Sequence, residues 1–228
     1  MLELHNYITI GNKMPGIDPN KATTLEQIYE YGVSIVDFYS RYVVPVAQHD
    51  FKLVPHFVEY TPWHLLLQNR ARLAHAILSK SNQPVVWSDV DILFIRECSD
   101  RLLELLGDND VLAMNDGDNG ISCGLVVYAP TTNAINFLEK VVNDEASYER
   151  AVQCDQEAHN KYRDMIKYEL LPKDEFFSSA FWIGGKPIPG WRPTHQVLPI
   201  NIRLFHATSA FGWDKTAILE IIKERVNK

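Results

Sequence analysis

Apolar residues recur along this chain at two spacings, one typical of strands and one typical of helices. Short runs rich in β-branched and aromatic residues at 2–11, 50–60 and 84–95 predict three strands. Between them, residues 23–43 and 62–80 place apolar side chains three and four positions apart, which predicts two amphipathic helices. Strands that alternate with helices in this way predict an α/β fold with a mostly parallel sheet.

The second half of the chain has a less regular pattern. It predicts strands at 110–116, 120–130 and 202–207, and helices at 99–107, 131–144, 153–166 and 215–226. Residues 167–201 are rich in Pro, Gly and Trp, and such irregular segments often form the wall of a substrate site. We therefore expect residues 176–191 to line a substrate site. Because the chain has no repeat and no long linker, it is predicted to form a single domain, residues 1–228.

Composition and charge narrow the classes of function. The formal net charge of −7 argues against nucleic acid as a partner, because nucleic-acid-binding proteins usually carry a basic patch. No segment approaches the ~18 consecutive apolar residues of a membrane span, and the first residues lack the basic start and apolar run of a signal peptide. The three cysteines lack metal-like spacing and fit a reduced compartment. We therefore expect a cytoplasmic protein with no membrane span.

Two aspartates interrupt the apolar run PVVWSDVDILFI, residues 84–95. Asp89 and Asp91 come where the strand proper ends, and ligands of open α/β sheets gather beyond the carboxyl ends of the strands. Two buried like charges are costly and repel each other. A hard dication, Mg²⁺ or Mn²⁺, bound through the carboxylate oxygens and shared with phosphate groups, would make the pair tolerable.

Two other interpretations of this aspartate pair remain open. Both carboxylates can be solvated at a strand end, since Asp-x-Asp is a common sequence. Haloacid-dehalogenase-type phosphatases also carry Asp-x-Asp after an apolar strand, and one aspartate is their nucleophile. Their pattern lies near the N-terminus and has Thr or Val two residues after the second aspartate, where this chain has Leu93. The phosphatase interpretation is therefore the weaker one.

Four stretches of the chain resemble a known group of enzymes. They are RARLAHAILSKSNQPVVWSDVDILFI (70–95), GISCGLVVYAPTTNAINFLEKV (120–141), CDQEAHN (154–160) and RLFHATSAFGWDK (203–215). Together they resemble GT-A glycosyltransferases, most of all the nucleotide-diphospho-sugar transferase family of plants, protists and viruses, and more loosely glycogenin and the bacterial lipopolysaccharide galactosyltransferases. The resemblance implies the Rossmann-like GT-A fold, with residues 1–115 binding the nucleotide and residues 116–228 the donor sugar and acceptor.

The resemblance also implies roles for individual residues. Asp89, Asp91 and His206 would hold the metal ion, and Asp155 and Gln156 would act beside the anomeric carbon of the donor. The implied donor-binding residues are Arg72, Ser88, Asp89, Val90, Gly124, Gly212 and Lys215. Thr9, Ile10 and Gly11 end the first predicted strand. Given the nucleotide donor that the resemblance implies, their backbone groups would contact a uracil edge. The chain departs from the family pattern at Ser122, where Asn is usual, and around Lys215, where Lys-Pro-Trp is usual.

The function implied is transfer of a hexose from a UDP-sugar to a glycan, glycoprotein or other hydroxyl acceptor. The acceptor would bind at the irregular segment 176–191. The reaction would retain the anomeric configuration and depend on Mn²⁺ or Mg²⁺. Two alternatives stay open: a metal-dependent phosphatase or nucleotidyltransferase that uses the same aspartates, and a non-catalytic relative that binds sugar nucleotides. The chain could act alone or as one domain of a longer polypeptide, and both possibilities stay open.

Overall fold

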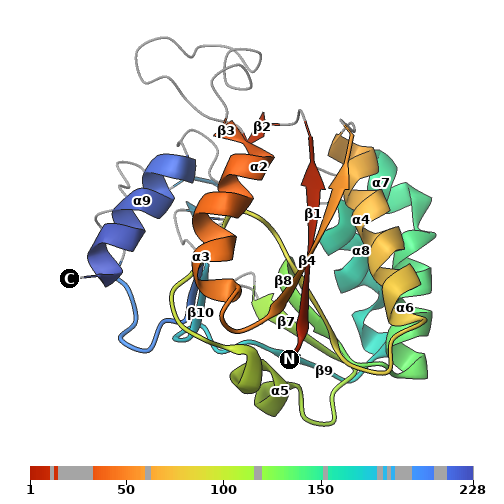
Figure 1. Cartoon of the computed structure of the whole chain (residues 1–228). Coiled ribbons are helices and arrows are strands. Elements are labelled where there is room, and N and C mark those ends of the chain that lie inside the picture. The colour runs from red at the N-terminus through yellow and green to blue at the C-terminus, as the bar shows by residue number, and fades with distance from the viewer. Residues whose placement is uncertain are drawn as a thin grey trace.

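The computed structural model describes residues 1–10, 13–14, 33–59, 63–115, 120–150, 154–178, 182–183, 186–187, 197–207 and 215–227. These residues form three layers (Figure 1). A central sheet is covered by one group of helices on one face, and by a smaller sheet with further helices on the other.

The central sheet has six strands in the order β4-β1-β5-β8-β7-β9. They are β1 (Glu3–Thr9), β4 (Lys52–Val58), β5 (Val85–Ser88), β7 (Val111–Asn115), β8 (Ile121–Tyr128) and β9 (Tyr168–Leu170). β1 runs parallel to β4 and β5, β7 runs parallel to β9, and β8 runs antiparallel to both of its neighbours. The short connection 116–120 between β7 and β8 accounts for the reversal, because antiparallel strands can be joined by a tight link. The predicted α/β fold with a mostly parallel sheet is confirmed.

The helices pack in two groups on the two faces of the sheet (Figure 1). One group comprises α4 (Trp63–Leu78), α6 (Thr132–Val142), α7 (Glu145–Arg150) and α8 (Cys154–Tyr162), followed by a 3-10 turn, Arg163–Met165. The other comprises α2 (Ile35–Phe38), a π-helical turn (Tyr39–Val43), α3 (Val44–Ala47), α5 (Ser99–Leu106) and α9 (Lys215–Val226). The pattern did not predict α7. Of the helix expected at 23–43, residues 35–43 are helical and the helix continues to Ala47, but Val33–Ser34 form strand β3 instead, and the residues before 33 lie outside the described part.

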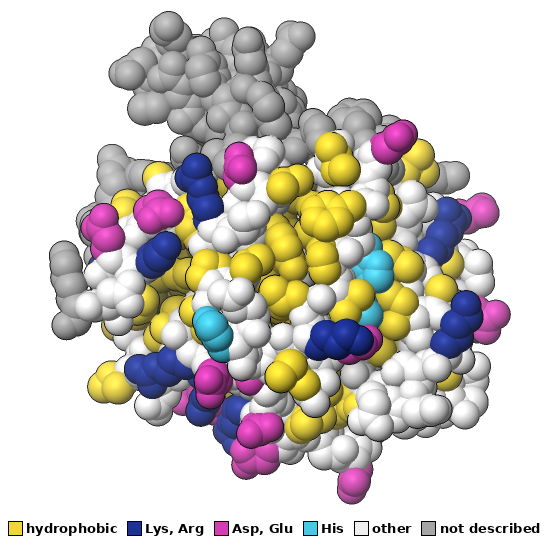
Figure 2. Space-filling view, viewed as in Figure 1, with side chains coloured by type: hydrophobic (Ala, Val, Ile, Leu, Met, Phe, Trp, Pro, Cys, Tyr) yellow, Lys and Arg dark blue, Asp and Glu magenta, His cyan; other side chains and the backbone are white. Residues whose placement is uncertain are grey.

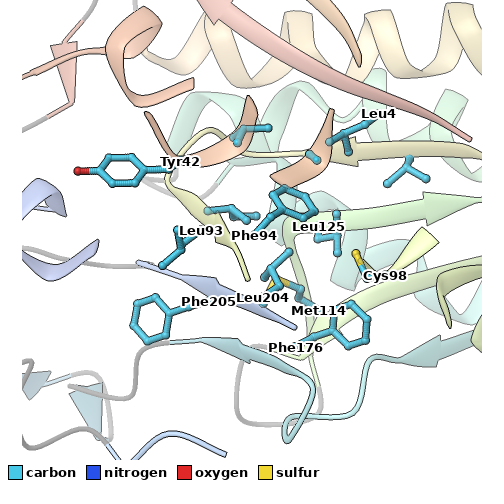
Figure 3. Close-up of a cluster of buried hydrophobic side chains, with 14 of the residues drawn as sticks. Leu4, Tyr42, Leu93, Phe94, Cys98, Met114, Leu125, Phe176, Leu204 and Phe205 are labelled. Carbon is cyan, nitrogen blue, oxygen red and sulfur yellow. The ribbon is translucent and has the colours of Figure 1, made fainter. Parts of the chain in front are cut away.

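A three-stranded sheet in the order β10-β13-β6 lies on the second face. Its strands are β10 (Phe176–Ser178), β13 (Leu204–His206) and β6 (Ile92–Phe94); β11 (Trp182–Ile183) pairs with β12 (Lys186–Pro187), and β2 (Lys13–Met14) with β3 (Val33–Ser34). Figure 3 shows side chains from both sheets, such as Phe94, Leu125 and Leu204, in one apolar cluster. Full burial of each such side chain contributes about 1.5–3 kcal/mol. This cluster therefore fixes the small sheet against the central one.

The run 84–95 is divided between the two sheets. β5 ends at Ser88 in the central sheet, whereas β6 starts at Ile92 and pairs with β13 in the small sheet. The strand proper was expected to end at the aspartates, and it does, at Ser88. The apolar residues that follow do not continue this strand, because the chain bends at Asp89–Asp91 and changes sheet. The bend carries both aspartates.

Strand β4 forms one edge of the central sheet, a position that accommodates its Pro55, since proline cannot donate a backbone hydrogen bond to a neighbouring strand. Most of its side chains are half-buried, Phe57 is exposed, and hydrophobic side chains gather over this edge in Figure 2. None of the helices within the described residues combines the length and apolar character that a membrane span requires.

Candidate active site

The bend after β5 is held by backbone hydrogen bonds from two other strands. The N–H of Asp89 donates to the carbonyl of Gly124 on β8 at 2.8 Å. The N–H of Ala207, just after β13, donates to the carbonyl of Asp91 at 3.0 Å. Strands from both sheets thus fix the backbone on either side of the two aspartates.

A third strand holds the bend through a side chain. The pairing of β1 with β5 ends at His5 and Trp87, one residue before the bend. The buried amide of Asn6 then donates from Nδ2 to the carbonyl of Ser88 at 2.9 Å, and the Ser88 hydroxyl donates to the carbonyl of Asp89 at 2.7 Å. The side chains of Asn6 and Ser88 therefore bind the backbone at the point where the ladder of backbone hydrogen bonds ends.

Asp89, Asp91 and His206 converge at this bend. His206 Nε2 lies 3.4 Å from Asp91 Oδ1 and 3.7 Å from Asp89 Oδ2. One possible ligand atom from each of the three residues lies within 4.8 Å of the other two. Asp91 and His206 are buried, and the Asp89 side chain is 25% exposed, so the cluster opens to solvent on the Asp89 side. Two carboxylate oxygens and one imidazole nitrogen at this spacing fit a divalent cation, and Mn²⁺ suits the mixed donor set.

Protein cations hold the remaining carboxylate oxygens. The buried Arg70 on α4 donates from Nη1 to Asp89 Oδ1 and from Nη2 to Asp155 Oδ2. The first residue of α9, Lys215, donates from Nζ to Asp91 Oδ2. Each aspartate of the bend therefore turns one oxygen to a protein cation and the other toward His206. This arrangement leaves the inner oxygens available for a single cation.

The two aspartates have opposite pKa shifts. Burial raises the pKa of the Asp89 carboxyl to about 6, and the neighbouring Asp91 charge adds to the effect of burial while Arg70 opposes it. Burial would also raise the pKa of Asp91, but Lys215 and His206 outweigh it and hold that pKa well below its usual range. Asp91 is therefore charged throughout the neutral range, and Asp89 becomes charged as the pH rises through about 6.

Gly124 is required where His206 meets β8. The register of β8 on β7 jumps from Val126–Ala113 to Ser122–Met114, and Gly124 lies among the residues of β8 between these two pairs, which have no register partner on β7. A Cβ atom at Gly124 would lie 2.3 Å from His206 Cε1 and 2.4 Å from His206 Nδ1. Only a residue without a side chain lets the imidazole approach the bend in this position.

We expect Gly124→Ala to lower the free energy of unfolding by about 1–3 kcal/mol, because the new methyl group must displace the imidazole. In a His206→Ala background the same change should cost clearly less, since the clashing ring is gone. Urea unfolding of the four proteins in this cycle measures the coupling. An equal cost in both backgrounds would contradict the contact.

Several residues expected from the sequence lie at or near this bend. Ser88 and Val90 are buried on either side of Asp89. Asp155, the second residue of α8, is buried and meets Arg70, and the half-buried Gln156 follows it with its N–H donating to Asp155 Oδ1 at 3.0 Å.

Other expected residues lie away from the bend or outside the described residues. Arg72 does not lie at the bend: it is exposed on α4, with Nη1 3.3 Å from Asn69 Oδ1, and Arg70 lies at the bend instead. Thr9 is buried at the end of β1, and Ile10 is 55% exposed, with its N–H donating to Val58. The predictions for Gly11 and Gly212, and most of the acceptor segment 176–191, lie outside the described residues.

Solved structures identify the class of this fold. A glycosyltransferase that acts in glycosylation of the major capsid of the virus PBCV-1 has a TM-score of 0.59 at 13% identity, covering 98% of both chains. Mouse xyloside xylosyltransferase 1 has 0.54 at 9%, covering 91% of this chain and 98% of its own. The galactosyltransferase LgtC, solved with donor and acceptor sugar analogues, has 0.54 at 12%, covering 98% and 96%. The fold is therefore that of the GT-A glycosyltransferases, as expected.

The family follows from the sequence. The family model for nucleotide-diphospho-sugar transferases matches residues 22–205, and the chain belongs to that family. A comparison with curated protein sequences gave no match. Family and fold together support a glycosyltransferase, for which a nucleotide-sugar donor and a glycan acceptor are implied.

Proposed function

We propose that this protein transfers a hexose from a UDP-sugar to a hydroxyl acceptor, with retention of anomeric configuration and with Mn²⁺ or Mg²⁺ as the cation. The observation that carries the proposal is the convergence of Asp89, Asp91 and His206 at the carboxyl end of β5. That edge is where open α/β sheets bind ligands. A dication bound there would neutralise charge on the diphosphate as the sugar–phosphate bond breaks.

The protein's own side chains have distinct roles in this proposal. Lys215, at the first turn of α9, is expected to place its ammonium group on the departing diphosphate. Arg70 holds Asp155 in a fixed position, and Asp155 is expected to accept hydrogen bonds from hydroxyls of the donor sugar. Gln156 beside it is expected to stabilise the positive charge that develops on the sugar ring. In a front-face transfer the acceptor oxygen attacks the anomeric carbon while its proton passes to the leaving phosphate oxygen.

A thermal-shift panel tests the proposal. UDP and UDP-hexoses with Mn²⁺ should stabilise the protein, whereas the same nucleotides with EDTA, or GDP-sugars with Mn²⁺, should not. At a hundred times its Kd, a ligand adds about 2.7 kcal/mol. For a chain of this length that corresponds to a rise in Tm of roughly 5–10 °C. A panel without any cation-dependent shift would contradict the proposal.

The same panel, extended by two assays, separates the alternatives. Release of phosphate from a generic phosphate ester without UDP binding would favour a phosphatase or nucleotidyltransferase. Cation-dependent UDP binding with neither hydrolysis nor transfer would favour a non-catalytic relative. Proton NMR of the first product formed distinguishes retention from inversion.

A further inference from the structure

The imidazole of His206 has one nitrogen at the proposed cation site and one nitrogen without a partner. Nε2 faces Asp89 and Asp91, at 3.7 Å and 3.4 Å. Nδ1 is buried and has no hydrogen-bond partner among the described residues. A neutral histidine that binds a cation through Nε2 carries its proton on Nδ1, and that N–H normally donates to an acceptor that fixes the tautomer and the ring.

Strand register sets two residues beside His206 in the small sheet. On one side is Ile92 of β6, which offers no hydrogen-bonding group. On the other side is Ser178 of β10, which pairs directly with His206 in a parallel ladder. The backbone that the ring meets at Gly124 carries no side chain. Ser178 is therefore the register neighbour of His206 that has a hydroxyl group.

Register partners on β10 and β13 share a face of the sheet. The preceding pair shows this directly, because the rings of Phe177 and Phe205 stack with centroids 6.0 Å apart. Side chains on adjacent strands start about 5 Å apart. The Ser178 hydroxyl oxygen is itself buried without a hydrogen-bond partner among the described residues. A buried nitrogen and a buried hydroxyl, each without a hydrogen-bond partner among the described residues, thus belong to directly paired residues on one face of the small sheet.

We propose that Ser178 is the positioning residue for His206. When the cation is bound, Nδ1–H donates a hydrogen bond to one buried water, which in turn donates to the Ser178 hydroxyl oxygen, and this holds the tautomer that leaves the Nε2 lone pair facing the two aspartates. This inference rests on the cation site of the proposed function. It adds a residue from β10 to that site and gives the small sheet a role beyond packing.

The test is Mn²⁺ binding to the nucleotide-free protein, measured by electron paramagnetic resonance of free Mn²⁺. Ser178→Ala should weaken Mn²⁺ binding by at least roughly tenfold, and Ser178→Thr, which keeps the hydroxyl, should bind within about twofold of the unchanged protein. Melting temperatures in EDTA serve as the control. Ser178→Ala should melt within about 2 °C of the unchanged protein, since it removes a hydroxyl that has no partner in the cation-free fold.

Nitrogen-15 NMR of the imidazole measures the tautomer of His206, which would not change if Ser178 contributed only to packing. In the Mg²⁺-bound protein, His206 should carry its proton on Nδ1, and in Ser178→Ala that signal should broaden or shift toward the other tautomer. Unchanged Mn²⁺ affinity together with an unchanged tautomer in Ser178→Ala would overturn this inference alone. Absence of Mn²⁺ binding in the unchanged protein would overturn the cation site and this inference together.

Discussion

Asp91→Asn should abolish sugar transfer and donor hydrolysis, to below about one thousandth of the unchanged protein's turnover. The substitution keeps the shape of the side chain but removes the charge that faces His206 and Lys215. It should also abolish cation-dependent UDP binding, which isothermal titration with Mn²⁺ and UDP measures. The fold should persist, because an amide at this position relieves repulsion from Asp89 and still accepts a hydrogen bond from Lys215.

Asp108→Asn is the matched control for this substitution. Asp108 is exposed, and the same change of chemistry there should leave turnover and UDP binding at the level of the unchanged protein. The Tm of Asp91→Asn in EDTA shows whether the variant is folded. A folded Asp91→Asn protein with unchanged turnover would refute the cation site.

Much of the fold could be predicted from local patterns. The closing strand and helix were expected at 202–207 and 215–226, and the structure has Leu204–His206 and Lys215–Val226. Both elements have clear periodicity and clear ends, so the local sequence is sufficient to predict their type and position. The convergence of Asp89, Asp91 and His206 was also expected, but from a resemblance, since 114 residues lie between Asp91 and His206 and no spacing rule joins them.

The end of a strand at the aspartates was predicted, but local patterns could not predict that the chain changes sheet there. The residues before and after the bend are equally apolar, so the sequence around it does not show that the chain changes sheet. Ile92–Phe94 join the small sheet because they pair with the strand Leu204–His206, which lies more than a hundred residues further along the chain. For the same reason nothing local marks Ser178, whose position beside His206 depends on the register of two distant strands.

The position of Arg70 at the bend, by contrast, could have been predicted, because the sequence contains a local signal that distinguishes Arg70 from Arg72. The buried positions of α4 include Leu67, Ala71, Ala74 and Leu78, spaced by three and four residues. Arg70 lies on that stripe, three residues after Leu67, whereas a residue two positions further on points to the opposite side of a helix. Helical periodicity therefore separates the two arginines, although the resemblance pointed to Arg72.

Arg70→Met should destabilise the protein by about 3–5 kcal/mol at pH 8, because it leaves the Asp89 and Asp155 carboxylates facing each other without their shared cation. Arg72→Met, two residues away on the exposed face of the same helix, should change stability by less than about 0.5 kcal/mol. Urea unfolding of both variants measures the difference. Donor hydrolysis should be lost in Arg70→Met and kept in Arg72→Met.

The pH dependence of this pair of variants identifies the cause. Without Arg70, the Asp89 carboxyl should have a folded-state pKa still further above that of the unfolded chain, since burial and the neighbouring Asp91 charge already raise its pKa to about 6 in the unchanged protein, where Arg70 opposes them. A carboxyl with a raised folded-state pKa stabilises the fold at low pH and loses that contribution as pH rises. The deficit of Arg70→Met should therefore shrink from pH 8 to pH 5. A constant deficit would indicate lost packing of the Arg70 stem instead of uncompensated charge, and an equal loss in Arg72→Met would contradict the assignment of Arg70.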